Sequence, residues 1–229
     1  ADKWNLSRED LDKFALESHQ KAAQATESKF FDKEILPIEG KNAEGINDLV
    51  MADEGIRFDA SLDKLAGLKT VTEGGVITAG NASQITDGAA AVMICNDAGL
   101  KKIQSSPRAE VVSISVVGDD PVFMLTGPIP ASIKALETAN LTIDDMDLYE
   151  VNEAFAPVPL AWASELQADR SKLNVNGGAM ALGHPLGATG AKLMTTLLHE
   201  MERRESTFGL QAICEGGGTA NATIIKRVG

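Results

Sequence analysis

Two glycine-rich segments in the last quarter of the chain constrain its fold more than any other feature. The first covers residues 176–190, with a lone histidine near its centre, and the second reads Cys-Glu-Gly-Gly-Gly over residues 214–218. Each follows a short apolar stretch typical of a strand, and the first leads into a long helical pattern. Glycine loops that join strands to helices or to other strands indicate an α/β domain built in layers.

The second half of the chain continues this alternation of strand and helix patterns. We predict strands over residues 111–117, 147–151, 173–175, 210–213 and 222–228, and helices over residues 131–139, 154–166 and 188–204. The polar stretch 96–107 before them is the best candidate for a domain boundary. We therefore expect one domain over residues 1–105 and a second over residues 106–229.

The first half has weaker periodicity. Ser7 is a good N-cap for a helix with an apolar face that continues to about residue 25, and His19 lies off that face, which predicts a solvated side chain. Residues 29–64 look like an ordered excursion, with a short strand near 35–38 and a short helix over 61–65. Residues 89–95 are small and apolar, so we predict a buried central strand with Cys95 as an inert core residue.

Composition excludes several classes of function. The 229 residues carry a net charge of -12, which argues against a nucleic-acid surface, and no apolar run approaches the roughly 18 residues of a membrane span. The only cysteines are Cys95 and Cys214, too few for a disulfide framework, and no signal peptide pattern leads the chain. We expect a cytoplasmic protein. No Cys-x-x-Cys or His-Glu-x-x-His spacing predicts a metal site.

Polar or reactive residues follow three of the predicted strands. Asn152 comes after the strand at 147–151, Asn176 after the one at 173–175, and Cys214 after the one at 210–213. Ligands of open α/β sheets gather at the carboxyl ends of strands, so these residues are candidates for one site.

Two of the candidate residues keep two interpretations. His184, between Gly183 and Pro185, is either a loop residue that caps a neighbour or a positioned base. Cys214 is either a buried residue of a tight hairpin or an acid/base beside a row of backbone N–H groups. Phosphate-loop, dinucleotide and nucleophile-elbow motifs are absent.

Four blocks in order resemble the thiolases, the acyl-CoA C-acyltransferase family. They are Thr-Ala-Gly-Asn-Ala-Ser at 78–83 with Asp-Gly-Ala-Ala-Ala at 87–91, Asn-Glu-Ala-Phe-Ala at 152–156, the Gly-His-Pro segment 176–190, and Cys-Glu-Gly at 214–216. The resemblance implies a thiolase-like layered αβαβα fold, here an incomplete first domain plus a complete second domain. It implies cleavage of 3-ketoacyl-CoA by CoA, or the reverse Claisen condensation, in fatty acid metabolism such as β-oxidation.

The resemblance also implies roles for matched residues. His184 looks like the base that activates a nucleophilic thiol, Asn152 like the residue that holds a water in the first oxyanion hole, and Cys214 like the acid/base at the α-carbon. Gly216 resembles a backbone donor of the second oxyanion hole. Positions that contact CoA or border the acyl pocket in relatives match Ser83, Arg57 and Met124. The resemblance implies no separate cofactor, because the CoA thioester is the substrate. It also implies that the intact protein forms a homodimer or homotetramer.

The sequence differs from the thiolase family in lacking a counterpart to part of the family's sequence. Thiolases are nearly twice this length, and their acyl-accepting cysteine lies in a half with no counterpart here, so we expect this chain to be inactive alone. The alternative is a non-catalytic module that binds CoA. Glu215 and Leu125 stand where smaller residues are more usual, and the sequence does not determine the acyl chain or the direction of the reaction.

Overall fold

The computed structural model describes residues 1–41 and 44–228 of the chain. Its α-helices are α1 (Arg8–Glu27), α2 (Leu62–Ala66), α3 (Asp97–Ile103), α4 (Pro128–Ala139), α5 (Pro157–Leu166), α6 (Ala179–Leu182) and α7 (Thr189–Arg204). Its strands are β1 (Ile38–Lys41), β2 (Asn47–Val50), β3 (Ala109–Gly118), β4 (Leu148–Val151), β5 (Phe208–Cys214) and β6 (Thr219–Arg227). Short 3-10 helices are η1 (Asp2–Trp4), η2 (Ile143–Asp145), η3 (Arg170–Lys172) and η4 (Gly216–Gly218).

A four-stranded mixed sheet organises the second half of the chain. Its strand order is β3-β6-β5-β4, with β4 and β5 parallel and the other two pairs antiparallel. The strands predicted over residues 210–213 and 222–228 are confirmed as β5 and β6, which pair as a hairpin on either side of η4.

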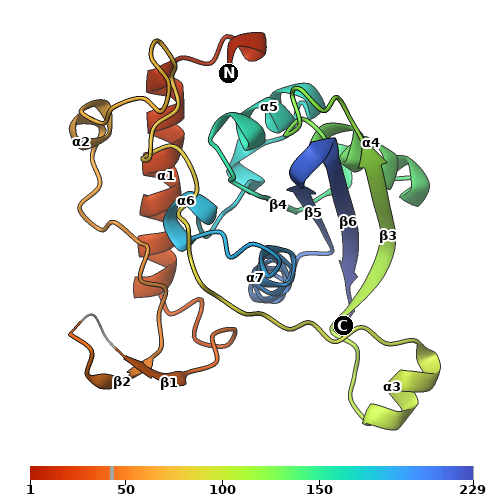
Figure 1. Ribbon diagram of the computed structural model, residues 1–229. Helices are drawn as coiled ribbons and strands as arrows, with labels where there is room; N and C mark the ends of the chain where they lie inside the picture. Colours follow the sequence, from red (N-terminus) through yellow and green to blue (C-terminus); the bar gives the residue numbers. More distant parts are fainter. Residues whose placement is uncertain (42–43, 229) are drawn as a thin grey trace.

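Helices cover both faces of this sheet (Figure 1), with α4 and α5 on one side and α7 on the other. Side chains alternate along β4 as a strand requires. Tyr149 packs edge-on against Trp162 of α5, with ring centroids 5.3 Å apart, while Leu148 packs with Leu197 and Met201 of α7. The carboxyl ends of β4 and β5 therefore emerge between two helical layers.

Helix α1 begins where the sequence predicts. Ser7 caps it, and the Asp10 carboxylate accepts a hydrogen bond from the Ser7 backbone in return, which satisfies two N–H groups that the first turn would leave unpaired. The helix packs along α6 and α2 (Figure 1).

The prediction that His19 is solvated is wrong. The side chain is buried, and its Nδ1 accepts a hydrogen bond from the Arg57 backbone N–H at 3.1 Å. The excursion between α1 and α2 folds back over this flank of the helix, a long-range contact that the apolar pattern of one helix does not reveal.

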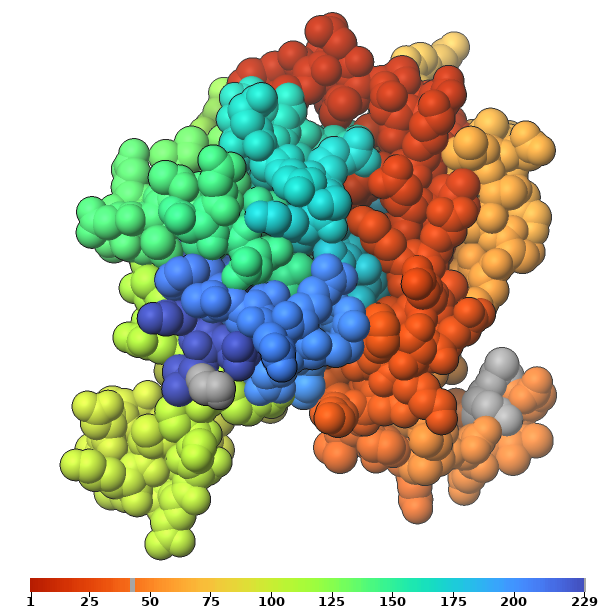
Figure 2. Space-filling model, turned by 180° about the vertical axis from the view of Figure 1, so that it is seen from behind, coloured from red at the N-terminus to blue at the C-terminus, as the bar shows by residue number. Residues whose placement is uncertain are grey.

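The central strand predicted over residues 89–95 does not form. The segment has no regular secondary structure, Met93 and Ile94 are about three-quarters exposed, and Cys95 is exposed rather than buried. A strand needs a neighbour for its backbone hydrogen bonds, and no strand of the described residues lies alongside this one. The segment leads into α3, which projects as a separate lobe in Figure 2.

Other differences are local. The strand expected over 173–175 is reduced to a single bridge, because the Asn174 side chain exchanges two hydrogen bonds with the backbone of Val151 in place of a main-chain ladder. The helix expected from residue 154 begins at Pro157, since residues 154–156 bond instead to residues 81–83. Residues 35–38 contribute only Ile38 to a strand, β1. Among the described residues, no helix has the length and apolar composition needed to cross a membrane.

Candidate active site

His184 is fixed by the loop between α6 and α7. Gly183 has φ +81°, a conformation that L side chains rarely adopt, and a Cβ there would overlap the Thr86 side chain. The tight approach lets the Thr86 hydroxyl oxygen accept a hydrogen bond from the His184 backbone N–H at 2.8 Å. Glycine at 183 is therefore required for the position of the histidine.

The hydrogen bonds around the His184 ring indicate its tautomer. The Thr189 hydroxyl donates its one proton to the Pro185 carbonyl at 3.0 Å, so its oxygen accepts from His184 Nδ1–H at 2.6 Å. Nε2 is then unprotonated and faces the Asn152 side-chain nitrogen at 3.4 Å. Burial, with a smaller contribution from the charge of Lys192, lowers the pKa of His184. A neutral imidazole with a lone pair at Nε2 is the form that a general base requires.

Asn152 lies one residue beyond the end of β4. Its backbone N–H continues the ladder by donating to the Ala212 carbonyl at 3.0 Å, and its side chain is buried. The side-chain nitrogen faces His184 Nε2 at 3.4 Å, and the same side chain lowers the pKa of the Cys214 thiol. Asn152 thus lies between the two other candidate residues, His184 and Cys214.

Cys214 ends β5 and packs with Ala154 and Val158, with Leu125 against the same cluster. Burial raises the pKa of the Cys214 thiol, and the charge of Glu215 adds to the rise, while hydrogen bonds from its own backbone and from Asn152 oppose it. The thiol is therefore protonated at neutral pH, which suits a proton donor better than a standing nucleophile.

The three glycines after Cys214 form η4 rather than a simple two-residue turn. Gly216 is exposed and a side chain there would meet nothing within 4 Å, so its backbone can be approached from solvent. The Glu215 carboxylate turns toward β6, where it accepts from the Asn221 amide at 2.7 Å and the Thr219 hydroxyl at 3.2 Å. These bonds direct the charge of Glu215 to β6.

Two of the three predicted substrate-contacting residues lie near this group. The Ser83 backbone N–H donates to the Ala154 carbonyl at 2.9 Å, which places Ser83 beside the Asn-Glu-Ala-Phe block. Met124 has φ +53° and precedes Leu125 of the Cys214 cluster.

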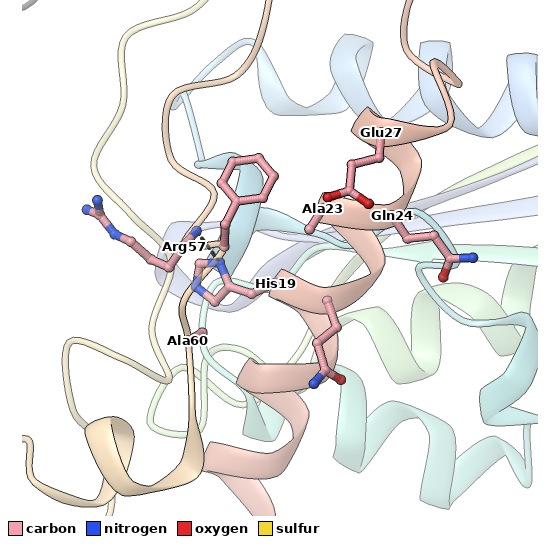
Figure 3. Close-up of a pocket in the computed structure, with 8 residues that line it drawn as sticks. His19, Ala23, Gln24, Glu27, Arg57 and Ala60 are labelled. Carbon is pink, nitrogen blue, oxygen red and sulfur yellow. Dashed lines mark hydrogen bonds between the residues drawn. The ribbon is translucent and has the colours of Figure 1, made fainter.

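Arg57 lies elsewhere, at a cavity of about 230 Å³ formed with His19, Gln24 and Phe58. Figure 3 shows the backbone of Arg57 against His19 and its guanidinium directed away from α1. The cavity at Arg57 includes none of His184, Asn152 and Cys214, so the structure does not bring Arg57 together with them.

A second cavity, of about 250 Å³, is lined mostly by apolar side chains and adjoins the Cys214 cluster through Leu125 and Val158. The remaining lining residues are Ala1, Trp4, Ile77, Phe123, Thr126, Phe155, Pro157 and Ala161. The site thus combines a polar group at the strand ends with an apolar neighbour.

Sequence reasoning missed two supporting residues. Thr189 holds the His184 ring, and the only signal was its place five residues along the same loop. Glu153 is fully buried and accepts from the Ser18 hydroxyl at 2.7 Å, the Asn174 amide at 2.8 Å and the Met180 backbone at 3.2 Å. It thereby ties α1 and α6 to the end of β4, although burial raises its pKa against these hydrogen bonds. Within residues 1–41 and 44–228, no group of three or more His, Cys, Asp or Glu side chains could hold a metal ion.

Comparison with known proteins identifies the family. Residues 1–98 match the thiolase N-terminal domain and residues 105–227 match the thiolase C-terminal domain. The chain is 52% identical over 228 residues to the steroid 3-ketoacyl-CoA thiolase FadA6 of Mycobacterium tuberculosis. This alignment covers all of the chain and 54% of that protein. It is 44% identical to the mitochondrial 3-ketoacyl-CoA thiolase of Mus musculus, over 99% of this chain and 57% of that protein.

Solved structures agree with the sequence matches. The acetyl-CoA acetyltransferase of Bacillus anthracis superposes with a TM-score of 0.94 at 41% identity, covering 99% of this chain and 58% of that one. Human mitochondrial 3-ketoacyl-CoA thiolase in complex with CoA superposes with a TM-score of 0.91 at 42% identity. The match covers 99% of this chain and 56% of that one. The chain belongs to the thiolase family, and both the family and the thiolase-like α/β fold expected from the sequence are confirmed. It spans between half and three-fifths of the length of these relatives.

Proposed function

We propose that the protein containing this chain is an acyl-CoA C-acyltransferase. It would cleave 3-ketoacyl-CoA with CoA to acetyl-CoA and a shortened acyl-CoA, or run the reverse Claisen condensation. The observation that carries the proposal is the position of Asn152 at the end of β4, with its side-chain nitrogen 3.4 Å from His184 Nε2 and its backbone bonded to β5, the strand that ends at Cys214. The relatives named as thiolases support it.

The proposed roles follow from protonation and geometry. The unprotonated Nε2 of His184 can take the proton of an incoming nucleophilic thiol, and the protonated Cys214 thiol can give a proton to the α-carbon of acetyl-CoA and take it back. Asn152 and the backbone N–H of Gly216 would stabilise oxyanions. One such donor is worth about 3 kcal/mol in the transition state.

The acyl-accepting cysteine would lie in a part of the protein outside these 229 residues. The chain spans just over half the length of its relatives, and Cys95, its one other thiol, is exposed and lies outside the apolar cluster around Cys214. On this proposal the 229 residues alone do not complete the reaction.

Ser83 and Met124 would contact the CoA thioester near Cys214, and Arg57 would contact its distant end. The apolar cavity beside Leu125 and Val158 would receive the acyl group. The Mycobacterium relative, named for steroid 3-ketoacyl-CoA, and the human relative solved with CoA support a CoA thioester as the ligand. We also propose a homodimer or homotetramer, a cytoplasmic location and a part in β-oxidation.

Thiolysis of 3-ketoacyl-CoA by the complete gene product tests the proposal. We expect acetyl-CoA to form only with the complete product, and the 229-residue chain to bind CoA in a calorimetric titration without turnover.

The alternative is a non-catalytic module that binds CoA, favoured by the absence of a second thiol from the group around Cys214. It would be supported, and the acyltransferase proposal refuted, if the folded complete product bound CoA but formed neither acyl-enzyme, by intact mass, nor acetyl-CoA.

A further inference from the structure

Three buried side-chain oxygens lie behind the active site without a hydrogen-bond partner in the described part of the chain. They are Glu150 Oε2, Asn152 Oδ1 and Gln211 Oε1, on residues that are 2%, 1% and 4% exposed. Such atoms are rare in folded proteins and each costs free energy when left unpaired. Glu150 and Gln211 belong to the adjacent strands β4 and β5, and Asn152 directly follows the end of β4, which points to a common cause.

The register of the sheet places these residues together. Glu150 of β4 is the direct partner of Gln211 of β5 in the parallel pair, and Asn152 follows Glu150 by two residues on the same face. Strands are about 4.8 Å apart, so the side chains of direct partners can reach one another. If Glu150 were ionised, all three oxygens would be acceptors and none could satisfy another. The Asn152 amide nitrogen faces His184, and no N–H of Gln211 reaches Glu150 Oε2, so a proton on Glu150 would supply the missing donor.

The charges that face Glu150 do not supply a counterion. Burial is the main cause that raises the pKa of Glu150 well above the ordinary value, and the carboxylates of Glu153, Glu34 and Glu200 add to the rise. Two amines oppose it, Lys21 and Lys192. The Lys21 amine donates to the Leu173 carbonyl at 3.0 Å and the Lys192 amine to the Leu182 carbonyl at 2.7 Å. A buried carboxylate without a paired charge is strongly disfavoured.

We propose that Glu150 is a positioning residue that carries a proton and donates it to Gln211 Oε1, so that the β4–β5 pair presents the Asn152 amide to His184 and Cys214. One proton turns Glu150 Oε2 into a donor and satisfies Gln211 Oε1 at the same time. The Asn152 side-chain nitrogen then keeps its orientation toward His184 Nε2. The inference rests on the proposed function, because only in that function does the orientation of Asn152 matter for catalysis.

The thiol of Cys214 reports the effect without any substrate. The Asn152 amide lowers the pKa of Cys214 by hydrogen bonding to it. If Asn152 loses its orientation, the thiolate loses that donor and thiol alkylation needs a higher pH. The experiment uses the full 229-residue chain with Cys95→Ser, so that Cys214 is the one thiol that reacts.

Three variants separate the possibilities. Glu150→Gln replaces the acid by an amide that can still donate to Gln211, and Glu150→Leu removes the donor. Leu148→Ala, on the same face of β4 but packed with Leu197, weakens the core without touching the polar group. Each is measured for melting temperature, for the pH profile of iodoacetamide alkylation and for the infrared band of protonated carboxyl groups.

We expect Glu150→Gln to lose one protonated-carboxyl band at pH 7 while keeping the melting temperature and the alkylation profile. Glu150→Leu should shift the profile by about one pH unit upward, a roughly tenfold slower reaction at a fixed pH below the midpoint. Leu148→Ala should lower the melting temperature alone.

An infrared spectrum of Glu150→Gln that matches the parent chain would overturn the proposal, since Glu150 would then be ionised. An unshifted profile in folded Glu150→Leu would overturn the positioning role. If that variant does not fold, the spectrum and the alkylation profile of Glu150→Gln still decide. Because no acyl-CoA is used, failure here is distinct from failure of the proposed function.

Discussion

At the scale of single residues, the Thr189 hydroxyl determines which nitrogen of His184 carries the proton. Its proton goes to the Pro185 carbonyl, so it can only accept from Nδ1. The sequence placed His184 in a glycine loop but left its role open between a capping residue and a base. The hydrogen bond between His184 Nδ1 and Thr189, five residues further on, favours the role of a base. It depends on how the loop folds onto the first turn of α7.

We predict that Thr189→Val removes the acceptor for Nδ1–H and costs about 0.5–1.5 kcal/mol of unfolding free energy, since a partly buried hydrogen bond is lost. The ring should then sample both tautomers, which ¹⁵N shifts of His184 will report.

Thr195→Val is the matched control, because the Thr195 hydroxyl donates within α7 to the Ala191 carbonyl and has no contact with His184. Equal effects on the His184 shifts from both variants would contradict the assigned tautomer.

At the scale of elements, the loop from α6 to α7 contains two glycines with positive φ. Gly183 has φ +81° and Gly187 φ +86°, but only at Gly183 would a Cβ overlap a neighbour, Thr86. Gly183, with ψ 165°, combines a backbone region essentially restricted to glycine with close packing against Thr86, whereas Gly187 has open space around it.

Gly187→Ala should cost about 1–2 kcal/mol, the strain of a left-handed alanine. Gly183→Ala should cost clearly more and should also displace His184, whose N–H bonds to Thr86. Thermal unfolding and the amide shift of His184 measure both, and equal losses would show that the Thr86 contact is unimportant.

Glu34 joins the turn after α1 to α7 and makes stability depend on pH. It accepts from the Thr196 hydroxyl at 2.9 Å, and burial raises its pKa from 4.5 to about 7. Between these values the folded chain holds a proton that the unfolded chain has lost, so this stabilisation is complete below pH 4.5 and is lost as pH rises through 7.

We predict that Glu34→Gln removes a fall of up to about 3 kcal/mol in unfolding free energy between pH 4.5 and 7. Urea unfolding at pH 5 and pH 8 measures it. The exposed Glu39→Gln in β1 should keep the fall, and an unchanged pH dependence in Glu34→Gln would show that Glu34 ionises normally.

The elements of the second half were predictable because their partners lie within that half. Strand β5, the η4 turn and β6 follow one another, and α4, α5 and α7 pack on the same sheet. Residues 89–95 failed as a strand because an apolar pattern encodes burial but not the partner that provides it. The prediction for His19 was wrong for the opposite reason. The helical pattern placed His19 off the apolar face, but a loop distant in sequence covers it.

At the scale of the whole molecule, an apolar segment stays uncovered. Ile85, Met93 and Ile94 are exposed along the stretch that ends at Cys95. Apolar surface of this kind marks a contact. We propose that a part of the complete protein outside these 229 residues covers it, in line with relatives whose length the chain spans only in part.

Cys95 should therefore react rapidly with iodoacetamide in the 229-residue chain and slowly in the complete gene product. Peptide mass spectrometry follows both thiols, with the buried Cys214 as internal reference. Equal rates for Cys95 in both proteins would contradict the proposed covering.

The most direct test of the proposed chemistry is Cys214→Ser in the complete gene product, assayed in two half-reactions. We predict that Claisen condensation of acetyl-CoA falls about 10²–10⁴-fold, the usual contribution of a general acid/base. Exchange of labelled CoA into acyl-CoA, which needs His184 but no proton transfer at carbon, should persist. Condensation at the parent rate in the folded variant would contradict the role of Cys214.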